Sequence, residues 1–265
     1  MYMWKIETTL EIVYEIKKSN KIFDIENLDL LGYGDLNISR KRFIVLDRVI
    51  GDLHLEEVKK YFDTHEIDYH ITLLEGGESE KNLKNLFHLL GEMERFGIQR
   101  KEEPIIGIGG GVVLDIVGLA STLYRRGVPY IRVPTTLLGI VDVSVAAKTG
   151  INFEDRRNRL GSYYPPVSTL LDSNFIGTLE DIEISSGLGE VLKMAVIKDY
   201  DLFLLLEQFG EDLLVRKFKN VDCSEEVIDR SIVGMKVELE NNLWEKNLKR
   251  CVDFGHSFSP IIEMR

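Results

Sequence analysis

The chain has 265 residues, of which 44% are apolar, and a formal net charge of −11. This apolar fraction supports a buried core and excludes a disordered chain. The acidic balance argues against a nucleic-acid partner, which needs clustered Lys and Arg, but a small phosphorylated substrate needs only a few local cations. The two cysteines form no CxxC pair, and neither a signal peptide nor a run of about 18 apolar residues is present. We therefore expect a cytoplasmic protein without a membrane partner.

The first two thirds of the chain alternate between strand and helix patterns. Short apolar runs typical of strands occupy residues 43–47, 69–74, 104–108 and 129–133. Apolar residues spaced by three and four predict helices at 54–64, 80–97 and 112–123. Such alternation predicts an α/β fold, with a parallel sheet and helices on its faces.

Beyond residue 172 the pattern is mainly helical. Residues 183–208, 224–243 and the end of the chain read as helices, with few strand signals. We place a domain boundary near Asp172, with an α/β domain at 1–172 and a helical domain at 173–265. Residues 259–265 look like the first turn of a helix without a terminating signal, which suggests a chain cut short.

A glycine-rich turn, GIGGGVVLD at 107–115, follows a predicted strand and opens a predicted helix. Glycines at such a turn let the backbone approach a pyrophosphate, and the helix N-terminus favours negative charge. The spacing alone is a weak signal, because Val112 stands where the GxGxxG fingerprint has its third glycine, and a simple turn is an alternative. Asp47, at a strand end, suits a ribose hydroxyl or equally a helix N-cap. The residues alone thus predict a nucleotide-binding α/β domain with an adjoining helical domain.

Four blocks of sequence, at 107–153, 157–166, 185–199 and 252–263, together resemble the signature of dehydroquinate synthases and related sugar-phosphate cyclases. The blocks occur in the family's order. The resemblance implies a Rossmann-like NAD domain, an α-helical metal-binding domain and an active site between them, in a homodimer. It also implies a reaction in which a secondary alcohol is oxidised, phosphate is eliminated, the ketone is reduced again and the ring recloses as a carbocycle.

By this resemblance, fourteen residues would contact NAD. Glu78 and Lys81 have an alternative as a solvated helix start, and Arg157 stands where the family usually has Lys, which is not a free exchange at a tight site. The predicted cofactor residues are Asp47, Glu78, Lys81, Gly110, Gly111, Val112, Asp115, Thr135, Thr136, Leu138, Arg157, Phe175, Thr178 and Leu179.

The resemblance also implies a divalent metal site, with zinc or cobalt suited to a Glu–His ligand pair. Glu190 matches the family's first ligand and His256 its second, while the third, another His, would lie beyond Arg265. Lys193 lies three residues after Glu190, and such a pair is often only a surface ion pair. Its apolar neighbours favour burial and hence a site. Two protein ligands are too few for a catalytic zinc, so residues 1–265 alone are not expected to complete it.

The predicted substrate contacts are mostly cationic or amide side chains, which suit hydroxyl and phosphate groups. We expect catalytic roles for Lys148, Asp142, Lys193, Lys236 and Asn158. Arg126 and Lys249 match the family less well, and a solvated surface is an alternative for both.

Two departures indicate which cyclase the chain resembles. Dehydroquinate synthases carry GHxxGH, whereas this chain has GHSFSP, with Pro260 in place of the second His. They also carry Asn where this chain has Asp253, near the substrate carboxylate, and an Asp there would repel a carboxylate. Both changes look like those of the branch that uses sedoheptulose 7-phosphate, which includes the 2-epi-5-epi-valiolone and desmethyl-4-deoxygadusol synthases. The alternatives are a dehydroquinate synthase, a glycerol-dehydrogenase-like oxidoreductase and an inactive truncated paralogue that only binds NAD.

Overall fold

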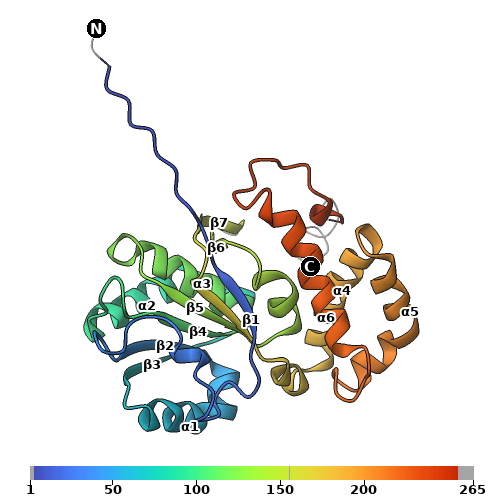
Figure 1. Cartoon of the computed structure of the whole chain (residues 1–265), viewed down its shortest axis with the longest axis horizontal. Coiled ribbons are helices and arrows are strands. Elements are labelled where there is room, and N and C mark those ends of the chain that lie inside the picture. Colours follow the sequence, from blue (N-terminus) through green and yellow to red (C-terminus); the bar gives the residue numbers. More distant parts are fainter. Residues whose placement is uncertain (1–2, 155, 256–265) are drawn as a thin grey trace.

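The computed structural model describes residues 3–154 and 156–255. A sheet with helices on its faces lies beside a group of helices, α4, α5 and α6 (Figure 1). The extended segment before β1 projects from the sheet-containing part. None of the helices in the described ranges combines the length and apolar character that a membrane span requires.

The main sheet has six strands, and every pairing in it is parallel. Its order is β1-β8-β5-β4-β2-β3. The strands are β1 (Glu15–Lys18), β2 (Lys41–Asp47), β3 (Asp68–Leu74), β4 (Ile105–Gly109), β5 (Tyr130–Pro134) and β8 (Ser168–Leu171). The predicted α/β class with a parallel sheet is thereby confirmed.

Strand β2 shows how the sequence builds two cores around one sheet. Ile44 and Leu46 pack with α1 (Arg48–Thr64) on one face. Phe43 and Val45 pack with α2 (Leu83–Phe96) and α3 (Gly111–Leu123) on the other. Alternate residues of a strand point to opposite faces, so a continuous apolar run suits a strand that is covered on both sides.

The order of the strands reverses between β2 and β4. From β2 the chain moves outward to β3 and then crosses back to β4 on the other side of β2. Open α/β sheets bind ligands at the carboxyl ends of strands beside such a reversal. Asp47 ends β2, and Gly110 follows β4, so two predicted cofactor residues flank this position.

Between β5 and β8 the chain makes a π-helical turn at Gly139–Val143 and an antiparallel hairpin of β6 (Lys148–Phe153) and β7 (Arg156–Tyr163). Ile140 and Val141 in the turn belong to the core of the helical part. The turn therefore joins the sheet to the helices, and it carries the predicted catalytic residue Asp142.

The helical part begins after β8 with a short 3-10 helix at Ser173–Thr178. It continues with α4 (Asp181–Ile197), α5 (Tyr200–Val215) and α6 (Ser224–Glu240). The pattern predicted over 183–208 is two helices, because Asp199 caps α5 by accepting from the backbone nitrogen of Leu202. A last 3-10 turn at Cys251–Asp253 brings the chain back against α4 and α6.

Candidate active site

The glycine turn lies between β4 and α3. A Cβ on Gly110 would lie 3.2 Å from Thr136 Cγ2, and one on Gly109 would lie 2.9 Å from Asp47 Cβ. A side chain at either glycine would therefore press on its neighbours, so the turn needs glycine for its packing, and the backbone N–H groups of the first turn of α3 lack helical partners. Helix N-termini of this kind favour anionic groups, so the predicted pyrophosphate contact stays a prediction.

Asp47 is a helix N-cap, which is one of the two roles predicted for it. Its Oδ1 accepts from the backbone nitrogen of Val49 at 3.0 Å and caps α1. Burial raises the pKa of its carboxyl group, partly offset by hydrogen bonds from the backbone. The cap does not remove Asp47 from the carboxyl edge of the sheet, so a ribose contact stays a prediction.

Lys81 connects residues that are distant in sequence. Its Nζ lies 2.6 Å from Asp115 Oδ2 and 2.6 Å from Asn158 Oδ1. Burial raises the pKa of Asp115, and the charge of Lys81 opposes that effect. Glu78 joins the same cluster by accepting from Asn152 Nδ2 at 2.7 Å and lying 3.5 Å from Arg157 Nε. The structure thus brings Glu78, Lys81, Asp115, Arg157 and Asn158 together under the β6–β7 hairpin.

The other predicted cofactor residues follow strand ends. Thr135, Thr136 and Leu138 follow β5, and Thr136 Oγ1 accepts from Gly139 N at 3.0 Å. Val112 is half-buried in the first turn of α3. Phe175 and Leu179 are buried, and the Phe175 ring packs on His54, whereas Thr178 is exposed. For Phe175 the observed contacts are those of a core residue.

A second group of predicted residues lines a small, partly open cavity of about 80 Å³ between the sheet-containing part and the helices. The π-helical turn, β6 and α4 each contribute to its wall. The predicted residues that line it are Asp142, Lys148, Glu190, Lys193 and Asp253. Five residues that span more than a hundred positions of sequence therefore meet at one place.

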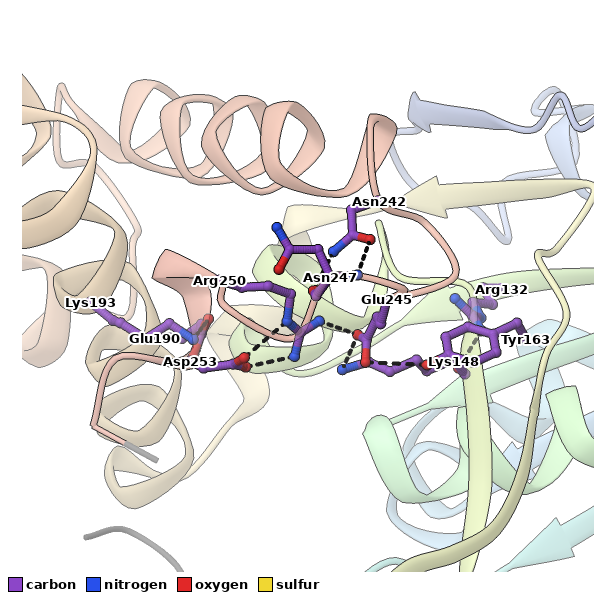
Figure 2. Close-up of polar contacts among 10 residues, drawn as sticks. All are labelled: Arg132, Lys148, Tyr163, Glu190, Lys193, Asn242, Glu245, Asn247, Arg250 and Asp253. Atoms are coloured by element: carbon purple, nitrogen blue, oxygen red, sulfur yellow. Dashed lines mark hydrogen bonds and ion pairs between the residues drawn. The ribbon is translucent and has the colours of Figure 1, made fainter. Parts of the chain in front are cut away.

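Alternating charges run along this cavity (Figure 2). Lys148 Nζ lies 3.0 Å from Glu245 Oε1, and Glu245 also pairs with Arg250. Arg250 in turn donates to both carboxylate oxygens of Asp253, from Nε at 2.9 Å and from Nη2 at 2.6 Å. Tyr163 donates to Glu245 Oε2 at 3.3 Å.

These contacts fix the charge state of the network. Burial lowers the pKa of Lys148, but the hydrogen bond and charge of Glu245 outweigh it, so the pKa is raised. Burial raises the pKa of Glu245, but Lys148 and Arg250 outweigh it, so that pKa is lowered. Lys148, Glu245 and Arg250 are therefore all ionised near neutral pH.

Glu190 and Lys193 form an ion pair on the cavity side of α4, with side chains 15% and 14% exposed. The pair is thus more buried than an ordinary surface ion pair, as its apolar neighbours predict. His256 and Pro260 lie outside the described residues. Within residues 3–154 and 156–255 no three His, Cys, Asp or Glu side chains form a group able to hold a metal. Of the predicted metal ligands, the described residues therefore include only Glu190.

Four of the predicted catalytic and substrate-binding residues do not line the cavity, and one of them, Asn158, lies in the Lys81 cluster instead. Lys236 pairs with Glu240 on the exposed side of α6, while its neighbour Met235 faces the cavity. One residue turns a helix by about 100°, which explains the difference. Lys249 is exposed, and Arg126 is exposed beyond the far end of α3 from the glycine turn.

The sequence reasoning missed three charged residues that the structure places in or behind the cavity: Glu245, Arg250 and Arg132. Arg132 is fully buried on β5 and donates to the carbonyl oxygens of Val143, Ala146 and Lys148. An Arg inside the apolar strand YIRVP was a usable signal, because buried charges nearly always have a specific partner. Glu245 and Arg250 gave no such signal, since they lie in a polar segment that resembles a solvated loop.

Comparison with known proteins gives matches along most of the chain. Residues 71–186 match the family model described as 3-dehydroquinate synthase N-terminal, and residues 187–265 match the one described as 3-dehydroquinate synthase C-terminal. A 2-epi-5-epi-valiolone synthase of Streptomyces albus is 45% identical over 99% of this chain and 65% of its own length. One from an Actinomyces species is 42% identical over 99% of this chain and 71% of its own length.

A solved structure gives the same result. The 2-epi-5-epi-valiolone synthase of Streptomyces hygroscopicus subsp. jinggangensis, with NAD⁺ and Zn²⁺ bound, matches 98% of this chain and 71% of its own with a TM-score of 0.91 and 39% identity. The chain thus spans about two thirds of the length of the relatives it matches.

Proposed function

Because the chain belongs to the dehydroquinate synthase-like family of sugar-phosphate cyclases, we propose that it forms the NAD-binding part and part of the substrate site of an enzyme acting on sedoheptulose 7-phosphate. The observation that carries the proposal is the carboxylate of Asp253 in the wall of the cavity. In dehydroquinate synthases this position is Asn and lies near the substrate carboxylate. A heptulose phosphate without a carboxylate avoids the electrostatic cost of a second carboxylate in a partly buried site.

The NAD residues act at the carboxyl edge of the sheet. The glycine turn and the N-terminus of α3 would hold the pyrophosphate, and Asp47 would lie beside a ribose. Bound NAD would supply a hydride acceptor that returns the hydride within one catalytic cycle. No net NADH is then released.

The cavity residues would act on the sugar phosphate. Lys148 and Lys193 are proposed to bind phosphate and hydroxyl oxygens, and the family resemblance gives Asp142 the role of an acid between the substrate and NAD. When phosphate is eliminated, the carbon beside the ketone passes a proton to a base, a C=C bond forms, the neighbouring C–O bond breaks and phosphate leaves. The cavity is small, about 80 Å³, and partly open, so we expect side chains in its wall to shift when a sugar phosphate binds.

The runner-up is a 3-dehydroquinate synthase. A relative of that description from Helicobacter pylori is 35% identical to this chain. This activity would use the same cofactor edge but requires room for a carboxylate near Asp253.

Phosphate release by the protein from its complete reading frame, supplied with NAD⁺ and Zn²⁺, tests the proposal. We expect release from sedoheptulose 7-phosphate, a carbocyclic product and no accumulation of NADH. Release only from the carboxylate-bearing heptulosonate phosphate identifies a dehydroquinate synthase instead. Accumulating NADH points to a dehydrogenase, and NAD binding without release from either substrate points to an inactive paralogue.

A further inference from the structure

Arg250 is the cation at the centre of the charge network. Its side chain is 13% exposed, it lines the cavity, and it lies between Glu245 and Asp253 (Figure 2). The preceding Lys249 is exposed, and its backbone nitrogen donates to Asn247 Oδ1 at 3.0 Å. Of the two adjacent cations, therefore, only Arg250 enters the site.

The geometry of the Arg250–Asp253 contact is bidentate. Nε and Nη2 each donate to a different oxygen of Asp253, at 2.9 and 2.6 Å. A guanidinium held in this way presents its two parallel N–H groups to the protein's own carboxylate, and these are the groups that would otherwise recognise a carboxylate on a ligand. Nη1 is also engaged, by Glu245. Asp253 thus occupies a built carboxylate receptor.

We propose that Arg250 is a specificity-determining residue, which Asp253 withholds from the substrate so that the site rejects carboxylate-bearing sugar phosphates. This inference rests on the proposed function and gives Asp253 a second mode of action. Direct repulsion by Asp253 needs only its charge, whereas withholding needs both the charge and the guanidinium. The two modes differ in what happens when Arg250 is changed.

Asn has nearly the shape of Asp but no charge and one acceptor oxygen. Asp253→Asn therefore frees part of the Arg250 fork without opening a cavity. We expect the NAD- and Zn²⁺-loaded protein to bind the carboxylate-bearing heptulosonate phosphate about tenfold more tightly after this change, the factor that one charge-assisted contact contributes.

Isothermal titration calorimetry with that heptulosonate phosphate, on the protein from its complete reading frame, tests the proposal. Asp253→Asn is compared with Asp253→Asn/Arg250→Gln and Asp253→Asn/Arg250→Lys. We expect the gain to disappear with Gln and to be smaller with Lys, which keeps the charge but lacks the fork. Lys246→Gln, which removes an exposed cation from the same segment, should bind as the unmodified protein does.

Two results would overturn the inference: no gain in Asp253→Asn, or a full gain that survives Arg250→Gln. The second result would mean that Asp253 acts by repulsion alone. The assay needs no turnover, so its result is separate from that of the proposed function, which depends on phosphate release from sedoheptulose 7-phosphate by the unmodified protein. NAD affinity and thermal unfolding establish that each variant is folded.

Discussion

The ammonium of Lys148 and the carboxylate of Glu245 lie 3.0 Å apart, and this contact joins the β6–β7 hairpin to the segment after α6. Lys148 has a half-exposed side chain at the cavity, while that of Glu245 is only 10% exposed. The buried carboxylate therefore anchors the more exposed cation. Arg250 holds the same carboxylate from the other side, so the network fixes the position of Lys148 relative to the helices.

Glu245→Gln is expected to lower the rate of phosphate release about a hundredfold, since a misplaced catalytic group can cost that much. The glutamine keeps the shape of the side chain but removes the charge that holds Lys148. NAD affinity should not change, because Glu245 is not at the cofactor edge. Steady-state phosphate release and NAD titration measure the two effects, with Lys246→Gln as the charge-loss control. A Glu245→Gln protein that retains its full kcat contradicts the prediction.

The same network predicts how stability depends on pH. The pKa of Glu245 is lowered from 4.5 in the folded state, so its contribution is present above about pH 4.5 and is lost as pH falls through the lower folded value. The pKa of Lys148 is raised from 10.5, so its contribution is present below that pH and is lost only as pH rises further. Thermal unfolding should show a constant Tm difference between unmodified and Glu245→Gln protein from roughly pH 6 to 9, shrinking below about pH 4.5. A difference that persists unchanged in acid rules out the ionised pair as its source.

The sequence was sufficient for strands β2, β3, β4 and β5 and insufficient for β1 and β8. β2 and β4 are continuous apolar runs that end in Asp47 and in glycines, so their positions and their cofactor edge are readable from composition. β1 has four residues and alternates weakly, and β8 is equally short. β1 pairs with β8, and β8 also pairs with β5, and local sequence patterns do not contain these pairings.

The site residues also divide into those that sequence motifs identify and those that depend on tertiary packing. Asp142, Lys148, Glu190 and Lys193 match motif blocks, and the fold brings them to one cavity. Motif matching could not place Lys236, because a difference of one residue on α6 decides whether a side chain faces the cavity or solvent. Arg250 lies in a polar segment whose burial depends on packing against α4 and α6. Contacts of this kind follow from tertiary structure and not from any local period.

Lys81 and Asp115 provide a test at the cofactor edge. Lys81→Met would leave the partly buried carboxylate of Asp115, whose side chain is 20% exposed, without the ammonium, at a cost of about 3 kcal/mol, as for other broken buried pairs. NAD affinity should fall as well. The double variant Lys81→Met/Asp115→Leu removes both charges and should recover most of the stability, as measured by urea unfolding. If the double variant is as unstable as the single one, the loss comes from packing and not from the stranded charge.

Gly118 is the point where α3 approaches the hairpin most closely. A Cβ there would overlap Thr149 Cγ2 and lie 3.1 Å from the Tyr130 hydroxyl. Gly118→Ala should therefore destabilise the protein by about 1–3 kcal/mol, although Ala is the better helix former. Gly210→Ala in α5 is the matched control, since nothing lies within 4 Å of its Cβ, and it should stabilise the protein by about 0.5–1 kcal/mol. Urea unfolding measures both, and equal shifts in the same direction contradict the close approach.

Arg132 holds the backbone of Lys148 in place by hydrogen bonds. Its Nη1 donates to the Val143 carbonyl at 2.8 Å and to that of Ala146, and its Nη2 donates to the Lys148 carbonyl at 3.2 Å. In the described ranges Arg132 forms no ion pair with a carboxylate. Its buried guanidinium instead contacts these backbone oxygens and the Tyr130 ring, whose centroid is 5.3 Å away. The guanidinium thus fixes the turn that carries Asp142 and the start of β6.

Arg132→Met should therefore lower both stability and activity, but not in proportion. The loss of these buried hydrogen bonds is expected to cost about 3 kcal/mol of unfolding free energy. The displaced Lys148 should lower kcat for phosphate release at least about tenfold in protein that is still fully folded. Arg132→Lys, which reaches fewer of the carbonyls, should have a stability and a kcat between those of the unmodified protein and those of Arg132→Met. Urea unfolding and phosphate release on the same samples separate the effects. A variant that loses stability but keeps its kcat shows that Arg132 supports the fold and does not position Lys148.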